Sequence, residues 1–135
     1  MRKEIQEKLE NLKQKTFVDI SNLQIKNNEI LEVMQQIFLV QPHISIMNLD
    51  GNQLSNEGAI TLSTCLGKFS ELSQLSLQFN KIDRSGAIAL FSLKNVLPNL
   101  TISFHGNTIH DTEEMADIEQ LAKEINYEPP KCYKI

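Results

Sequence analysis

The stretch LSQLSLQFNKIDRSGAIALFSL, residues 72–93, begins with the pattern of a strand and ends with the pattern of a helix. Leu75 and Leu77 alternate with polar residues, which is the period of a strand with one buried face. From Gly86 onward, apolar residues recur at helical spacing. Between the two halves lies Asn80, among apolar positions where an amide without hydrogen-bond partners would be costly. The stretch therefore predicts a strand, a turn that contains a buried asparagine, and a helix.

The same unit recurs along the chain. The apolar residues around Asn52, and the Gly-Ala pair six residues after it, repeat around Asn80 after 28 residues. A copy around Asn28 lies 24 residues before Asn52, and a degenerate copy around Asn107 lies 27 residues after Asn80. Each unit has an apolar flank that it cannot bury alone, so successive units are expected to stack around a shared core.

The asparagine in each turn has a structural explanation. A short amide side chain both donates and accepts hydrogen bonds, so it can pair the backbone groups that a turn between stacked units would bury. Each such group left unpaired would cost about 1–3 kcal/mol. The sequence therefore predicts a structural ladder formed by Asn28, Asn52, Asn80 and Asn107.

The repeated pattern LxxLxLxxNxL, followed by a helix, resembles the leucine-rich repeat. The 28-residue copies, which open their helix with Gly-Ala, are similar to the ribonuclease-inhibitor subtype of that family. The resemblance covers roughly residues 18–126 and implies an α/β fold. This fold would be a leucine-rich-repeat solenoid of about four strand–helix repeats, with a short parallel sheet on the concave side and helices on the convex side.

Both ends of such a solenoid need a cap, because its terminal units expose apolar flanks. Residues 1–16 predict a charged amphipathic capping helix, and residues 18–110 hold the repeats. Residues 111–126 predict a closing helix with Asp111-Thr112 as its N-cap, and residues 127–135 form a tail. We therefore expect one leucine-rich-repeat domain over residues 1–135 that is a monomer when alone.

The composition narrows the class of partner. The 135 residues are 41% hydrophobic and 22% charged, which is an ordinary balance for a globular domain. The formal net charge of −4 argues against nucleic acid and anionic membrane surfaces, since both attract basic faces. No apolar run reaches the roughly 20 residues of a membrane span, and the polar N-terminus lacks the apolar centre of a signal peptide. A cytosolic site of action is the simplest expectation.

Few residues of the sequence are candidates for catalysis, disulfide formation or metal binding. Cys65 and Cys132 make neither a disulfide framework nor a zinc-binding spacing. His43, His105 and His110 are expected on the surface or in capping roles, since none stands in a recognisable catalytic pattern. The sequence predicts no catalytic residue, no metal site and no cofactor, so we expect a protein that is not an enzyme. An enzyme that uses Cys132 or a histidine is the least favoured alternative.

On the implied scaffold, the strand residues between buried positions point to the concave side, because side chains alternate across a strand. Most of them are uncharged and polar, with Ile46 and Phe79 as apolar exceptions, and apolar anchors ringed by polar groups are typical of protein interfaces. The alternative is a solvated face on which Phe79 packs against a neighbouring coil. The predicted partner-binding residues are Asn22, Gln24, Lys26, Ile46, Asn48, Asp50, Gln74, Ser76, Gln78, Phe79, Thr101, Ser103 and His105.

The favoured function is a non-enzymatic protein-binding module that grips a partner protein through its concave face. The resemblance to the ribonuclease-inhibitor subtype implies that binding can inhibit a partner enzyme by blocking its active site. The chain also resembles short leucine-rich-repeat effectors of intracellular bacterial pathogens, and its glutamate-rich C-terminus is similar to type IV signals for secretion into host cells. The partner would then be a host protein or a second bacterial effector enzyme. The alternative is an adaptor that recruits a host substrate to ubiquitin-transfer machinery.

Overall fold

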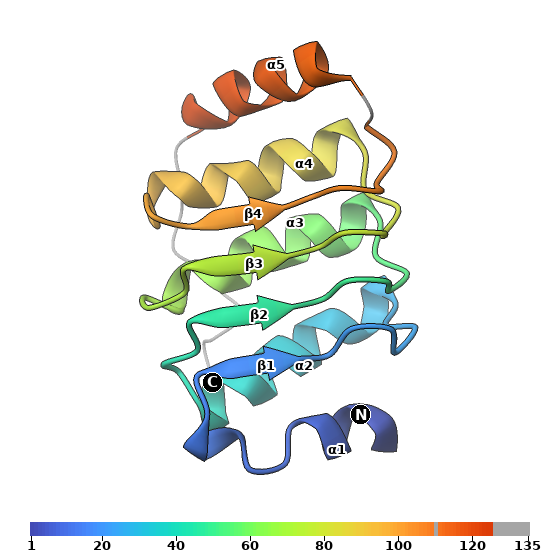
Figure 1. Ribbon diagram of the computed structural model, residues 1–135, viewed down its shortest axis with the longest axis vertical. Helices are drawn as coiled ribbons and strands as arrows, with labels where there is room; N and C mark the ends of the chain where they lie inside the picture. The colour runs from blue at the N-terminus through green and yellow to red at the C-terminus, as the bar shows by residue number, and fades with distance from the viewer. Residues whose placement is uncertain (110, 126–135) are drawn as a thin grey trace.

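The computed structural model describes residues 1–109 and 111–125. Strands and helices alternate along the chain, and Figure 1 shows the strands as one layer in front of a layer of helices. In chain order the elements are α1 (Lys3–Lys8), β1 (Phe17–Asp19), α2 (Asn27–Val40), β2 (Ile46–Asn48), α3 (Asn56–Cys65), β3 (Gln74–Ser76), α4 (Arg84–Phe91), β4 (Thr101–Ser103) and α5 (Thr112–Lys123). Short 3-10 turns lie at Leu12–Gln14, Leu66–Lys68 and Ser92–Asn95.

The strands form one parallel sheet in sequence order, β1-β2-β3-β4. The central residue of each strand points toward the helices and the two flanking residues point away, as alternation across a strand requires. The central residues lie side by side in the order Val18, Met47, Leu75 and Ile102. The predicted α/β solenoid with short parallel strands is therefore confirmed.

The first repeat differs in register from the prediction. β1 pairs Val18 with Met47, so the residue that corresponds to Asn52 is Leu23. Asn28 lies in the first turn of α2, where it is exposed. Its assignment to the asparagine ladder is therefore wrong.

The start of α2 determines this register. The carboxylate of Glu29 accepts a hydrogen bond from the backbone N–H of Lys26 (3.0 Å), which caps the helix so that it begins at Asn27. In each of the first three repeats the helix begins ten residues after its strand begins. Because this interval is constant, the early start of α2 requires an early strand. The apolar residues within 20–25 line the connection between the two elements instead of forming the strand.

The N-terminal cap is shorter than the helix predicted over residues 1–16. α1 ends at Lys8, Asn11 has a left-handed backbone (φ 61°), and a 3-10 turn follows. The apolar stripe of the predicted helix is nevertheless buried, since Ile5, Leu9 and Leu12 are 0%, 8% and 2% exposed. The turn at Asn11 lets this segment fold back below β1, where it covers the end of the core (Figure 1).

The C-terminal cap is α5. The side chain of Asp111 accepts a hydrogen bond from the backbone N–H of Glu113 (2.9 Å), which is the interaction of an N-cap. Ile118 and Ala122 are buried against the last repeat, whereas Ile125 is 39% exposed beyond the end of the helix. The end of the predicted closing helix at 126 and the predicted tail, 127–135, lie outside the described residues.

Asn52, Asn80 and Asn107 each join two neighbouring coils. The side-chain N–H groups of each donate to one carbonyl of its own coil and one carbonyl of the preceding coil, at 2.9–3.1 Å. The Oδ1 atom of each accepts from a backbone N–H of the preceding coil, such as that of Leu54 for Asn80. All three side chains are at most 5% exposed. They therefore satisfy backbone groups that stacking removes from water.

A second asparagine ladder, which the repeat pattern does not predict, joins the starts of the helices. Asn27 Oδ1 accepts from the backbone N–H groups of Ser55 (3.0 Å) and Gly58 (2.9 Å), so a residue of α2 caps α3. Asn56 caps α4 in the same way. A Cβ atom on Gly58 would lie 2.4 Å from Asn27 Oδ1. The glycine of the Gly-Ala pair is therefore required by the asparagine of the preceding coil.

Candidate protein-binding face

The outward side chains of the four strands and the turn residues that follow them form one surface, which we call the strand face. Outward residues of neighbouring strands lie in register, so they make two rows across the sheet. The rows are Phe17-Ile46-Gln74-Thr101 and Asp19-Asn48-Ser76-Ser103. The turn residues that continue the face are Asp50, Gln78, Phe79 and His105.

The register brings the predicted residues of the last three repeats together on the strand face. Of the residues predicted from the first repeat, Gln24 and Lys26 lie in the connection between β1 and α2, beyond the positions that the strand face includes, so their assignment to this face is wrong. Asn22 takes the place that Phe79 has in the third repeat, with the same left-handed backbone (φ 55°). In the observed register the residues that correspond to Ile46, Asn48 and Asp50 are Phe17, Asp19 and Ser21, and none of these three was predicted. The ten-residue interval between the start of a strand and the start of its helix is the signal that could have found them.

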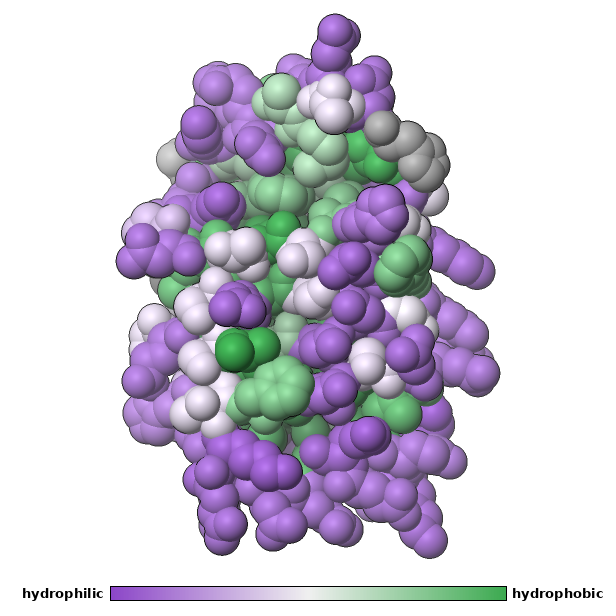
Figure 2. All heavy atoms as spheres, viewed as in Figure 1, coloured by the Kyte–Doolittle hydropathy of each residue, from purple (hydrophilic) through white to green (hydrophobic). Residues whose placement is uncertain are grey.

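Apolar side chains are exposed at two places on the strand face. Phe17 is 44% exposed beside the half-buried Ile46, and Phe79 is 58% exposed beyond the end of β3. Figure 2 shows hydrophobic surface gathered over β1 and β2, with hydrophilic surface below it. Exposed aromatic and aliphatic side chains that lie together, rimmed by polar groups, are typical of protein-contact sites.

Phe79 has a backbone conformation that favours glycine. Its φ of 59° is left-handed, which costs a residue with a Cβ atom roughly 1–2 kcal/mol. The equivalent residues of the neighbouring coils are Gly51 (φ 67°) and Gly106 (φ 81°). The Phe79 ring lies over Gly106, where a Cβ atom would come within 2.4 Å of it, and it meets the His105 ring edge-to-face at 5.7 Å between centroids. The ring thus packs on the next coil and still exposes more than half of its residue's surface.

Several polar side chains of the strand face are already engaged within the protein. Asp50 Oδ1 accepts from Ser76 Oγ (2.5 Å) and from the backbone N–H of Gln78 (2.8 Å). Asn48 Oδ1 accepts from the backbone N–H of Asp50 (2.9 Å). These side chains hold the strand ends and turns in place, so they are less available to a partner than the sequence suggests. Within residues 1–109 and 111–125, the side chains without a hydrogen bond include those of Gln74, Thr101 and Ser103.

The strand face is acidic. Asp19 Oδ1 accepts hydrogen bonds from the hydroxyl (2.6 Å) and the backbone N–H (3.0 Å) of Ser21, and these bonds hold the pKa of Asp19 below its ordinary value. The charge of Lys8 lowers this pKa further, although Lys8 is not a residue of the strand face. Asp50 supplies a second carboxylate, and the residues that define the face include no lysine or arginine.

A hollow of about 240 Å³ lies between the two rows of outward side chains on the strand face.

Of the four other residues that the sequence analysis considered for chemistry, the structure describes two, His43 and Cys65. His43 pairs with Glu71 on the surface, and Cys65 is buried in α3. His110 and Cys132 lie outside the described residues. Within residues 1–109 and 111–125, no group of three or more His, Cys, Asp and Glu side chains is placed to hold a metal ion. No helix in that part of the chain has both the length and the apolar character of a membrane span.

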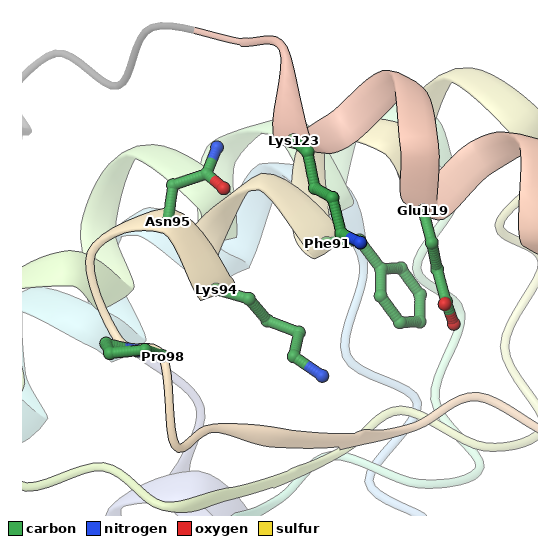
Figure 3. A pocket seen from close by; sticks show the side chains of 6 residues that line it. All are labelled: Phe91, Lys94, Asn95, Pro98, Glu119 and Lys123. Atoms are coloured by element: carbon green, nitrogen blue, oxygen red, sulfur yellow. The ribbon is translucent and has the colours of Figure 1, made fainter.

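A second hollow of about 240 Å³ lies between the last repeat and α5 (Figure 3). Lys94 and Asn95 reach it from the turn after α4, and Glu119 and Lys123 reach it from α5. The side-chain amide of Asn95 donates to the carbonyl of Ala122 at 2.9 Å, which attaches α5 to the repeats. This hollow is part of the joint between the solenoid and its cap, and it lies apart from the strand face.

Comparisons with known proteins agree with this architecture. Residues 40–63 and 72–91 match a family model described as Leucine Rich repeat. A solved structure titled "Leiomodin-1 Actin-Binding Site 2 (ABS2)" is similar to the chain, with a TM-score of 0.72 and 21% sequence identity over 92% of this chain and 75% of that one. A comparison with curated proteins finds no match. With its repeated sequence, its parallel sheet and its outer layer of helices, the chain has the fold of a leucine-rich-repeat solenoid.

Proposed function

We propose that this protein is a non-enzymatic binding module that grips a partner protein with its strand face. The observation that carries the proposal is the exposure of two aromatic residues, Phe17 and Phe79, on the strand face. Full burial of such a side chain by a partner is worth about 1.5–3 kcal/mol. The left-handed backbone at Phe79 adds support, because strained residues cluster where a protein binds its ligands.

Inhibition of a partner enzyme is the finer form of this proposal. Four strands span about 14 Å at their usual spacing, which suits an element that projects from a partner and not a broad flat surface. An inhibitor should bind its enzyme at one-to-one stoichiometry and suppress turnover. The alternative adaptor, which recruits a host substrate to ubiquitin-transfer machinery, should bind two partners at the same time.

The cellular role belongs to the same proposal. Resemblance to short leucine-rich-repeat effectors and the glutamate-rich C-terminus support a bacterial effector that a type IV system secretes into a host cell. Its site of action would be the host cytosol, and its partner a host protein or a second effector enzyme. Fusion of residues 112–135 to a reporter enzyme would test the secretion signal, since a signal should carry the reporter into host cells.

Photo-crosslinking tests whether the strand face contacts a protein. A photoreactive phenylalanine derivative is placed at Gln74 on the strand face or at Ile60, which is 46% exposed on α3. Both proteins are irradiated in extracts of the organism that makes the chain and of its host. We expect a discrete adduct from position 74 and none from position 60. An adduct that forms only at position 60 would place the interface on the helices and overturn the proposal.

Removal of the two aromatic rings should abolish that adduct without unfolding the protein. Phe17→Thr keeps a strand-forming residue, and Phe79→Gly introduces the residue that neighbouring coils hold at this position. We expect the double variant to lose at least about tenfold in affinity, because interface anchors contribute 2 kcal/mol or more. The matched control is Leu31→Gln with Leu39→Gln, which removes apolar groups that are 41% and 62% exposed on α2. Equal loss in the control would mean that the rings have no special role.

A further inference from the structure

We propose that the strand face binds a helix of the partner protein, and that this helix carries a large apolar side chain and, one or two turns away, an arginine or lysine. The inference rests on the proposed function and names the chemistry of the partner. It follows from the distribution of charge on the face and from the position of its apolar residues. It also follows from the hydrogen bonds within the protein that already engage polar side chains of the face.

The apolar end of the strand face can hold one large side chain. Phe17 and Ile46 are paired across β1 and β2, and both line the hollow of about 240 Å³. Hydroxyl and amide side chains, among them Gln74 and Ser76, line the rest of this hollow. An aliphatic or aromatic side chain of the partner would cover the exposed part of the Phe17 ring, and the polar groups would form its rim.

The carboxylates lie further along the strands from this apolar end. Asp19 is two residues beyond Phe17, and Asp50 is four residues beyond Ile46. In both carboxylates Oδ1 accepts the hydrogen bonds of the scaffold, whereas Oδ2 bonds no residue in the described part of the chain. The face therefore offers two carboxylate oxygens and includes no lysine or arginine, so it is complementary to an arginine or lysine of the partner.

The spacing matches the turns of a helix. A strand rises about 3.3 Å per residue, so Asp19 lies roughly 7 Å along the sheet from the apolar end. The Asp50 carboxylate, in the turn after β2, lies beside Ser76 and is at least as far along the sheet. A helix rises about 1.5 Å per residue, so side chains four and eight residues apart on one face are about 6 and 12 Å apart. A helix that lies along the strands can therefore place an apolar residue at position i and a basic residue at i+4 or i+8.

A helix also fits the hydrogen bonding of the face better than an extended segment. The backbone groups of β2 and β3 pair with a strand on each side, and side chains such as Asn48 and Ser76 are bonded within the protein. An extended partner would bring backbone groups that find few free donors and acceptors here. A helix satisfies its own backbone and presents only side chains. Its diameter of about 10–12 Å also suits a sheet about 14 Å wide.

A displayed library of alanine-rich helical peptides tests the inference directly. Three positions, i, i+4 and i+8, are randomised, and the library is selected on the immobilised full chain. We expect large apolar residues at i and arginine or lysine at i+4 or i+8. Selection of acidic residues at these positions, of no residue type, or of no peptide at all would overturn the inference. The crosslinking experiment at Gln74 does not depend on peptides, so it decides the proposed function separately.

The affinity of a selected peptide should depend on the two carboxylates. Asp19→Asn with Asp50→Asn keeps an acceptor oxygen for the scaffold and removes both charges, so the melting temperature should change little. We expect binding, measured by fluorescence anisotropy at low salt, to weaken about tenfold or more, and the difference from the unmodified protein to shrink in 0.5 M salt. The control removes the same charge from exposed helix positions, Glu57→Gln with Glu119→Gln. Unchanged affinity in the first variant, or equal loss in both, would contradict the proposed role of the carboxylates.

A change in the peptide supplies a test that leaves the protein unaltered. Replacement of the selected basic residue by glutamate should abolish binding to the unmodified chain, because two carboxylates would then face a third. If the glutamate peptide binds as well as the original, the affinity of the strand face does not depend on the charge of its partner. The inference then fails even if the apolar residue is still selected.

Discussion

Asn80 illustrates how much one residue contributes to a stacked fold. Its side-chain N–H groups donate to the carbonyls of Leu49 and Leu77, and its Oδ1 accepts from the N–H of Leu54. Leucine has a side chain of similar branched shape and no hydrogen-bonding group. A leucine at this position would leave these buried backbone groups without partners, at about 1–3 kcal/mol each.

We therefore expect Asn80→Leu to lower the free energy of unfolding by about 3 kcal/mol or more. Urea denaturation followed by circular dichroism measures this change. Asn28→Leu is the matched control, because Asn28 is exposed in α2 and its amide bonds no residue of the described chain. Its effect should lie within about 0.5 kcal/mol. Similar losses from the two substitutions would contradict the ladder as the structure shows it.

At the scale of the elements, each helix depends on the helix before it. Asn27 belongs to α2, yet its hydrogen bonds cap α3, and its Oδ1 occupies the space that a Cβ atom on Gly58 would need. The Gly-Ala pair therefore reflects a contact between helices. In an ordinary helix interior, alanine would be favoured over glycine by about 0.5–1 kcal/mol.

A double-mutant cycle measures this dependence. Gly58→Ala should destabilise the unmodified protein by about 1–3 kcal/mol, because the new methyl group displaces the Asn27 side chain. In an Asn27→Ala background the same substitution should be neutral or stabilising by up to about 1 kcal/mol, since the obstructing oxygen is gone and alanine favours the helix. Denaturation of all four proteins supplies the coupling energy. An identical cost of Gly58→Ala in both backgrounds would show that the asparagine is not its cause.

At the scale of the whole molecule, the solenoid is a stack of repeats closed at its N-terminal end by a short cap. Arg2 attaches this cap to the first repeat, with Nε donating to Glu29 Oε2 (2.7 Å) and Nη2 donating to the carbonyl of Leu23 (2.6 Å). The hydrogen bond from Arg2 holds the pKa of Glu29 below its ordinary value of 4.5. Terminal units have one neighbour only, so they are expected to open before the centre.

The lowered pKa of Glu29 has a defined consequence for stability. A carboxylate whose pKa is lower in the folded state stabilises the protein fully above its unfolded-state pKa, and this contribution disappears as the pH falls through the lowered value. We expect the amides of residues 3–12 to lose protection, measured relative to their intrinsic exchange rates, below about pH 4.5, before the central strands do. Glu29→Gln, which cannot titrate, should show a smaller change between pH 7 and pH 3 than the unmodified protein. Glu57→Gln should behave like the unmodified protein, and equal pH dependence in all three would contradict this role of Glu29.

The repeats around Asn52 and Asn80 could be predicted from the sequence, because their apolar template recurs with little ambiguity and strand alternation then assigns the outward residues. The copy around Asn107 is degenerate, but Ile102, Phe104 and Asn107 keep the template, so its strand could be predicted too. The first repeat could not be predicted in the same way. Val18 and Ile20 fit the template, but Ile20, Leu23 and Ile25 fit it too, so local periodicity allows two registers. The cap that Glu29 forms and the pairing of β1 with β2 select one of them.

The candidate site was predicted in part for the same reason. The outward residues of β2, β3 and β4 followed from the period of a strand, whereas Phe17 and Asp19 depended on the register of β1. The exposure of the Phe79 ring beside His105, and the use of Asp50 by the scaffold, depend on neighbours in other coils. The sequence contains these residues, but it does not indicate which of them meet.

By itself, the sequence determined that the chain coils into stacked strand–helix units, because the spacing of apolar residues within about 30 positions leaves each unit one flank to bury, and only another unit of the same kind can cover it. Only the tertiary structure decided which strand begins the sheet, which glycines a neighbouring asparagine requires, and which acidic and aromatic side chains share the strand face. These features arise from contacts between residues 27–29 positions apart, where the backbone of one coil meets the side chains of the next.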